Sequence, residues 1–272
     1  MPGARAEVRL LGIDLAWGSR ARTGLAALDL RGRLLDLRDV QSDEGIVDWM
    51  STWAPGPCVV GIDAPVVVRN PTGARDCERL VTRYFGRHHA GAHPTNTGNP
   101  AFAGGSTRAL RLADRLGLDI DPRSGAARRV LEVFPHPATV ALLGLPSVLR
   151  YKNKPGRDIA LLNRETVLLL DLLEGLADGD PPLLVTDQPG WTAVRSAVGS
   201  ATRKADLRRV EDRIDAVICA YVALLALRAP HRLHVFGDAA SGYIVTPVTA
   251  EIAARVAVDG LDQARIGSLA AP

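Results

Sequence analysis

Two aspartates each end a short apolar run, and both follow the same two residues. The first run reads LLGID and ends at Asp14, and the second reads VVGID and ends at Asp63. Burying an unpaired carboxylate costs several kcal/mol, so each acid needs a cation or a hydrogen-bond donor beside it. Either acid alone also fits a strand-end residue that caps a turn, but the repeated context favours a common site. The fold must therefore compensate two charges at the ends of two buried strands.

The spacing of turns and apolar runs places these two strands side by side. Arg31-Gly32 is a hairpin turn, so the first three strands form an antiparallel meander. A helix joins the third strand to the fourth, which lets the fourth lie parallel to the first. The predicted strands are 7–16, 22–29, 33–40 and 58–63, and the predicted helix is 42–53. Asp14 and Asp63 then emerge at the same carboxyl edge, where open α/β sheets place their ligands.

The remaining pattern completes one α/β domain over residues 1–272, with a long irregular insertion at about 66–127. We expect a mixed sheet in which strands one to three are antiparallel and strands four and five are parallel to strand one, with helices on both sides. The later predicted strands are 129–134, 233–236 and 242–246. The later predicted helices are 74–86, 107–116, 138–144, 158–176 and 206–228, with a small helix near the end. Residues 88–105 are rich in Gly, Pro and Asn and are predicted to form a loop.

The helix predicted over 206–228 carries acids that fit a site at the sheet edge. Asp212 and Asp215 are three residues apart and share a helix face. Small residues follow Asp215 and would let the helix approach the sheet closely: Ala216, Cys219, Ala220 and Ala223. Glu211 and Asp212 are also explained by the positive end of the helix dipole. The helix dipole explains Asp215 least well, because Asp215 lies beside the face of small residues and is poorly placed for solvent.

Glu132 is the fourth candidate acid. It lies in the strand predicted over 129–134, in phase with Val130 and Phe134, which turns it toward the apolar side. An edge strand that uses a charge to block further pairing is the alternative. Convergent carboxylates repel one another unless cations neutralise them, and hard oxygen ligands select Mg²⁺ or Mn²⁺. Such ions can activate water for attack on a phosphodiester.

Several basic and imidazole side chains are weaker candidates for contacts with a substrate. Lys152, Lys154 and Arg157 form a compact basic loop that suits a phosphate group or is a solvated turn. His136, just past the fifth strand, is a candidate substrate contact or proton carrier. Two further groups have ordinary explanations, as loop residues and as a helix cap respectively: His88, His89 and His93, and Gly104-Gly105-Ser106-Thr107.

Composition narrows the class of protein. The net charge is +3, so nucleic acid or another phosphate ligand would be bound by local basic patches rather than by a polycationic surface. Three widely spaced cysteines, Cys58, Cys77 and Cys219, form no disulfide or metal signature, which favours a reducing compartment such as the cytoplasm. No apolar run is long enough for a membrane span, and no signal peptide is evident, so we expect no membrane partner.

Several short motifs, taken in order, resemble the predicted nucleases grouped as domain of unknown function 429, in the ribonuclease H-like superfamily. The matching pieces are GIDLAW at 12–17, GIDAP at 61–65, RDCERL at 75–80, EVFPHP at 132–137, YKNKPGR at 151–157, EDRIDAVICAY at 211–221 and GYIVTP at 242–247. The resemblance implies a ribonuclease H-like sheet and marks four residues as catalytic: Asp14, Asp63, Glu132 and Asp215. The Asp212-x-x-Asp215 pattern is similar to that of the Holliday-junction resolvases, which carry glutamate where this chain has Asp63.

The function expected from these features is metal-dependent hydrolysis of phosphodiester bonds in nucleic acid. Asp14 and Asp63 would hold Mg²⁺ or Mn²⁺, Asp215 would complete the site with help from Glu132, and Asp212 would be a neighbour or an alternative ligand. One alternative is an actin-like phosphotransferase or ATPase. That class needs two sheet domains and glycine-rich phosphate-binding loops, and GIDLAWGS is the only segment of this sequence that hints at such a loop. The other rival is a catalytically silent module that binds nucleic acid or protein on the same scaffold.

Overall fold

A computed structural model describes residues 7–16, 21–261 and 266–267; the last residue of GIDLAW and the end of GIDLAWGS fall outside these ranges. The strands are β1 (Arg9–Asp14), β2 (Thr23–Leu28), β3 (Leu34–Val40), β4 (Cys58–Ile62), β5 (Arg128–Glu132), β6 (Leu233–Asp238) and β7 (Gly242–Pro247). The α-helices are α1 (Asp43–Trp53), α2 (Asp76–Phe85), α3 (Arg108–Leu116), α4 (Pro135–Leu142), α5 (Ile159–Glu174), α6 (Pro189–Gly199), α7 (Lys204–Arg228) and α8 (Ala250–Val258). Short 3₁₀ turns are η1 (Gly86–His88), η2 (Pro100–Gly105), η3 (Gly175–Asp178) and η4 (Pro230–Arg232).

The central sheet has the predicted mixed topology. Its strand order is β3-β2-β1-β4-β5, with β1, β2 and β3 antiparallel and with β4 and β5 parallel to β1. The turn between β2 and β3 uses Gly32 at a φ of 79°, a left-handed conformation that glycine adopts without strain. In the β1–β4 register Ile13 lies beside Ile62, so Asp14 and Asp63 leave the sheet at the same level.

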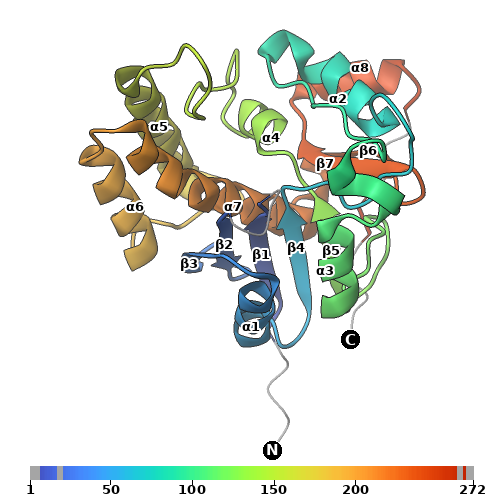
Figure 1. Cartoon of the computed structure of the whole chain (residues 1–272), viewed down its shortest axis with the longest axis horizontal. Coiled ribbons are helices and arrows are strands. Elements are labelled where there is room, and N and C mark those ends of the chain that lie inside the picture. Colours follow the sequence, from blue (N-terminus) through green and yellow to red (C-terminus); the bar gives the residue numbers. More distant parts are fainter. Residues whose placement is uncertain (1–6, 17–20, 262–265, 268–272) are drawn as a thin grey trace, which may run out of the picture.

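Helix α7 crosses one face of the sheet and contacts β1, β2 and β4 (Figure 1). Three glycines make this close approach possible, because a Cβ atom at any of them would lie 2.3 Å or less from a backbone oxygen of α7. These glycines are Gly12, Gly24 and Gly61. The small residues of α7 are therefore matched by glycine on the strands, as the sequence of the helix predicted. The outer side of α7 packs against α5 and α6 in the larger hydrophobic core.

The opposite face of the sheet is covered by α1 and α3. Alternate residues of β1, such as Leu11 and Ile13, point into a second core with Ile46 and Trp49 of α1 and Leu112 of α3. Sheet residues therefore alternate between the two cores, as expected for a sheet buried on both faces. The site at the carboxyl edge stands on a rigid three-layer frame.

A smaller sheet, formed by antiparallel β6 and β7, packs with α2 and α8 beside β5. Its core is aromatic: Phe236 stacks on Tyr84 at 5.5 Å between ring centroids and meets Phe85 edge-on at 6.4 Å. Val133 forms an isolated bridge to Val245, which links this unit to the end of the central sheet. Between β4 and β5 the chain thus contributes α2 to a third hydrophobic core, which it shares with β6, β7 and α8.

Two helices differ from the sequence predictions, and proline explains both. Helix α6 was not predicted. It begins at Pro189, and proline is favourable at the first helical position, since that N–H has no partner inside a helix. Helix α4 begins at Pro135, earlier than the predicted 138, for the same reason. In the described part of the chain no helix combines the length and apolarity that crossing a bilayer requires.

Candidate functional site

Three aspartates from three elements meet at the carboxyl edge of the sheet. Asp14 ends β1, Asp63 follows β4 directly, and Asp215 comes from α7. One carboxylate oxygen from each lies within 4.8 Å of the other two. Within residues 7–16, 21–261 and 266–267 this is the sole group of three potential ligands that close together. The structure therefore brings together the three acids that the sequence singled out first.

Local backbone contacts fix the two strand-end acids. The Asp63 N–H donates to the Ile13 carbonyl at 2.8 Å, which continues the β1–β4 pairing by one residue. Asp14 pairs with Gly24 of β2 on its other side. Both side chains keep part of their surface on a cleft, while protein surrounds them elsewhere.

Burial and mutual repulsion disfavour the charged forms of these acids. Burial raises the pKa of Asp14 well above its usual range, and the neighbouring Asp63 raises it further, while Lys152 lowers it. Burial also raises the pKa of Asp63 to about 7, against the opposing effect of Lys152. Carboxylates in this state gain most from a bound cation, because a cation removes both the repulsion and the cost of burying charge.

Asp215 is fully buried and is held by two consecutive residues. The Tyr151 hydroxyl donates to Asp215 Oδ1 at 2.6 Å, and Lys152 Nζ lies 2.5 Å from Asp215 Oδ2. Among the described residues, Oδ2 has this ammonium as its charge partner and no assigned hydrogen-bond donor. Tyr151 and Lys152 therefore fix the orientation of the Asp215 carboxylate, and Lys152 offsets its charge.

A cleft of about 520 Å³ opens over Asp14, Asp63 and Lys152. Its outer wall is formed by the first turns of α7 and carries both signs of charge. The charged residues of that wall are Arg208, Arg209, Glu211 and Asp212, and Arg22, which precedes β2, lines the same cleft. Burial raises the pKa of Glu211 to about 7 and that of Asp212 to about 6. Asp212 thus lines the approach to the three aspartates without joining their group.

Glu132 lies near Asp63, but its carboxylate is bound to Arg75. The guanidinium donates to both oxygens, with 2.6 Å from Nη2 to Oε1 and 3.0 Å from Nη1 to Oε2, and the Val66 N–H donates to Oε2 at 2.7 Å. Both side chains are buried. Burial disfavours the charge on Arg75, but Glu132 raises the pKa of Arg75, so the guanidinium stays charged. Glu132 is outside the group of three aspartates.

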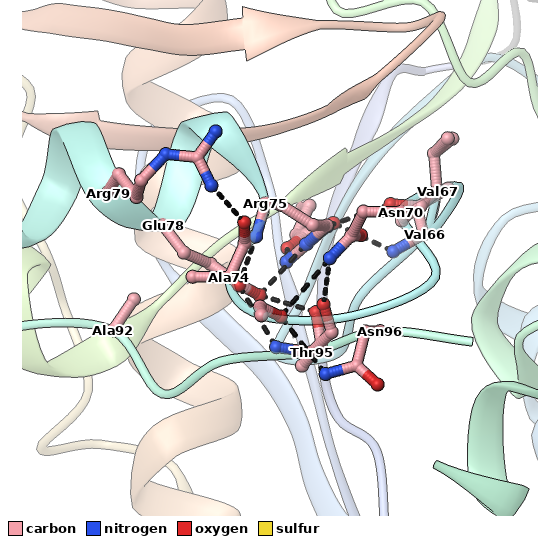
Figure 2. A network of polar contacts seen from close by, with 12 residues as sticks. Val66, Val67, Asn70, Ala74, Arg75, Glu78, Arg79, Ala92, Thr95 and Asn96 are labelled. Atoms are coloured by element: carbon pink, nitrogen blue, oxygen red, sulfur yellow. Dashed lines mark hydrogen bonds and ion pairs between the residues drawn. The ribbon is translucent and has the colours of Figure 1, made fainter. Parts of the chain in front are cut away.

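Arg75 is the centre of a buried polar network that ties the insertion to the sheet. Figure 2 shows Arg75 and Glu78 facing each other, with Thr95 beside them. Arg75 Nε donates to Glu78 at 2.8 Å, and its Nη1 donates to the Val67 carbonyl at 2.9 Å. The Thr95 N–H donates to the other oxygen of Glu78 at 3.0 Å. The network therefore anchors the chain on either side of α2 to the end of β5.

The predicted basic loop is divided by the structure. Lys152 lies beside the three clustered aspartates, in contact with Asp215, whereas Lys154 is exposed. Arg157 donates to the Lys152 carbonyl at 2.8 Å and so stabilises the conformation of the loop. His136 lies between Phe134 and Tyr151, at 5.2 and 6.3 Å between ring centroids. Burial lowers the pKa of His136 to about 3, so its imidazole is neutral at physiological pH.

The two weakest candidates of the sequence have local explanations. His88 accepts from Arg87 and contacts the Pro146 carbonyl, and no group of three ligands involving it is found among the described residues. Thr107 caps α3 by accepting from the Leu110 N–H at 3.0 Å. Two residues with clear roles were not singled out from the sequence, although both stand in the quoted motifs: Arg75 in RDCERL and Tyr151 in YKNKPGR.

The model of the family described as "Protein of unknown function (DUF429)" matches residues 12–240. The chain belongs to this family. The match includes all three clustered aspartates and ends inside the region of β6 and β7. No curated protein and no solved structure matches the sequence. Membership in DUF429 therefore names no activity, and the evidence for the chemistry of the chain is the geometry of the site.

The donor set of the site fits a hard divalent cation. Asp14, Asp63 and Asp215 offer oxygen ligands only, which is the set that Mg²⁺ and Mn²⁺ prefer. The nearest cysteine, Cys219, is buried in the core, and burial raises its pKa well above the usual range, which disfavours the thiolate that zinc needs. The raised pKa values of Asp14 and Asp63 agree with a site that gains from a bound cation.

Proposed function

We propose that this DUF429 protein is an Mg²⁺- or Mn²⁺-dependent hydrolase of phosphodiester bonds in nucleic acid. The observation that carries the proposal is the meeting of Asp14, Asp63 and Asp215 within 4.8 Å at the carboxyl edge of parallel strands. The strand order agrees with the ribonuclease H-like resemblance of the motifs. Three free cysteines are consistent with a cytoplasmic location.

The chain supplies the ligands and their orientation. Asp14 and Asp63 hold the cation, and Asp215 completes the cluster while Tyr151 fixes its carboxylate. A divalent cation bound there supplies the Lewis acidity that activates water and offsets the charge of a phosphodiester. Because Asp14 and Asp63 line the cleft, a phosphate group that enters it meets the cluster directly.

The walls of the cleft suit a phosphate backbone. Arg208 and Arg209 lie in the wall, and the basic loop with Lys154 and Arg157 lies next to Lys152 in sequence. Contacts of this kind position a nucleic acid without reading its bases. His136 is neutral, with a pKa of about 3, which is too low for efficient proton transfer near pH 7, so we assign it a packing role beside Tyr151.

A cleavage assay with labelled single-stranded, duplex and branched DNA and RNA tests this function. With Mn²⁺ or Mg²⁺ the wild-type chain should cut at least one of these and leave a 5′-phosphate, and Asp14→Asn should lower the rate by at least about 100-fold because it loses a metal ligand. Failure to cut any member of the panel, with ATP hydrolysis in its place, would support the phosphotransferase rival. Binding of nucleic acid without cleavage in either metal would support the silent module.

A further inference from the structure

Lys152 places its ammonium directly against the carboxylate cluster. Its Nζ is 2.5 Å from Asp215 Oδ2, and its side chain lines the same cleft as Asp14 and Asp63. The Lys152 side chain is 21% exposed, whereas that of Asp215 is 0% exposed. A lysine ammonium is positively charged at neutral pH, because its ordinary pKa is about 10.4. The folded chain therefore already holds one cation against its carboxylate cluster.

The position of Lys152 is built by its neighbours. Tyr151 donates to the other oxygen of Asp215 at 2.6 Å, and Arg157 donates to the Lys152 main-chain carbonyl at 2.8 Å. Two consecutive side chains thus contact one buried carboxylate, and the Arg157 hydrogen bond stabilises the backbone of the residue that carries the ammonium. A solvated surface lysine has neither feature, and Lys154, two residues later, is exposed.

Charge and space then limit what else the cluster can hold. With all three aspartates deprotonated, as metal ligands have to be, Asp14, Asp63 and Asp215 carry three negative charges and Lys152 carries one positive charge. The net charge of −2 that remains is the charge that one divalent ion neutralises. Farther out in the same cleft, Arg208 and Arg209 accompany Glu211 and Asp212. A two-ion site would need a second cation about 3.5–4 Å from the first. At Asp215 the Lys152 ammonium already supplies a positive charge, with Nζ 2.5 Å from Oδ2.

We infer that the ammonium of Lys152 takes the place of a second divalent ion, so that the cluster binds one Mg²⁺ or Mn²⁺ per chain, at Asp14 and Asp63. This inference rests on the proposed metal site and specifies how many ions it takes. Lys152 then has the role that the second ion has in a two-metal site. Its ammonium neutralises the buried Asp215 carboxylate and places a positive charge beside the bound phosphodiester.

Isothermal titration of the full chain with Mn²⁺ tests the inference without measuring activity. The wild type should bind one ion. Lys152→Met keeps the length of the side chain and removes its charge, and should bind two. Lys154→Met, a matched change at an exposed lysine in the same loop, should bind one. Circular dichroism and melting curves of each variant check that it is folded.

The number of bound Mn²⁺ ions separates the role of Lys152 from the existence of the metal site. Two ions on the wild type would overturn the role of Lys152 and leave the proposed hydrolase standing. One ion on both the wild type and Lys152→Met would show that the site has a single position whatever residue stands at 152, and would also overturn it. No ion on the wild type would remove the metal site and the proposed function together. If Lys152→Met does not fold, Lys152→Gln replaces it, and the wild-type stoichiometry still separates one ion from two.

Discussion

A Cβ atom on Gly12 would lie 1.8 Å from the carbonyl oxygen of Ala216 and 2.5 Å from the main-chain nitrogen of Ala220. The middle of β1 thus contacts the backbone of α7 at Ala216, which directly follows Asp215, and at Ala220. Since the neighbouring atoms are backbone, they cannot move aside as a flexible side chain would. The distance between Asp14 and Asp215 is therefore set by the absence of a side chain at Gly12.

Gly12→Ala should destabilise the protein strongly. The methyl group would push α7 off the sheet, and overpacking of this kind costs about 3 kcal/mol or more when the backbone must shift. Urea denaturation measures the free energy of unfolding. Gly199→Ala at the end of α6 is the matched control, since its Cβ meets nothing within 4 Å, and it should change stability by less than about 0.5 kcal/mol. Equal effects of the two substitutions would contradict the close contact.

Tyr151→Phe should lower stability by about 1–3 kcal/mol, because Asp215 Oδ1 loses a donor that water does not replace at a fully buried site. Urea denaturation again gives the value. In an Asp215→Asn background the same substitution should cost less, since a neutral amide needs the hydroxyl less than a carboxylate does. Equal costs in the two backgrounds would show that the hydroxyl and the carboxylate are not coupled.

The architecture was predictable from the sequence to the extent that it depends on local pattern. Alternating apolar runs and the Arg31-Gly32 turn predicted the order and direction of five strands, and small residues on α7 predicted its close approach. The partner of Glu132 was not predictable in this way. Arg75 is 57 residues away in sequence, and the pairing depends on how α2 and the core that it forms with β6 and β7 pack beside β5.

Glu132→Gln should destabilise the protein by about 3–5 kcal/mol, because it leaves the buried charge of Arg75 without its partner. Mn²⁺ binding by the folded fraction should keep its stoichiometry, since Glu132 lies outside the group of aspartates. Thermal denaturation and Mn²⁺ titration measure the two properties separately. Unchanged stability combined with lost Mn²⁺ binding would instead make Glu132 a metal ligand and support the catalytic role that the resemblance implied for it.

Without metal, stability should fall as the pH rises toward neutrality. The pKa of Asp63 is about 7 in the folded chain against 3.8 ordinarily, so the folded state binds more protons than the unfolded state between these values. The free energy of unfolding then decreases with rising pH through that window and levels off above it. Urea denaturation with a chelator at about pH 5.5 and about pH 8 should show a smaller decrease in Asp63→Asn than in the wild type. Equal decreases would contradict the raised pKa.

The central claim is that Asp14, Asp63 and Asp215 form a divalent-cation site, and the melting temperature in Mn²⁺ tests it most directly. At about 100 times the dissociation constant, an ion that binds only the folded chain stabilises it by about 2.7 kcal/mol. For a chain of this size that corresponds to a rise of about 5–10 °C. We predict this rise for the wild type near pH 8, and its loss in Asp14→Asn. An equal rise in both proteins, or none in the wild type, would contradict the account.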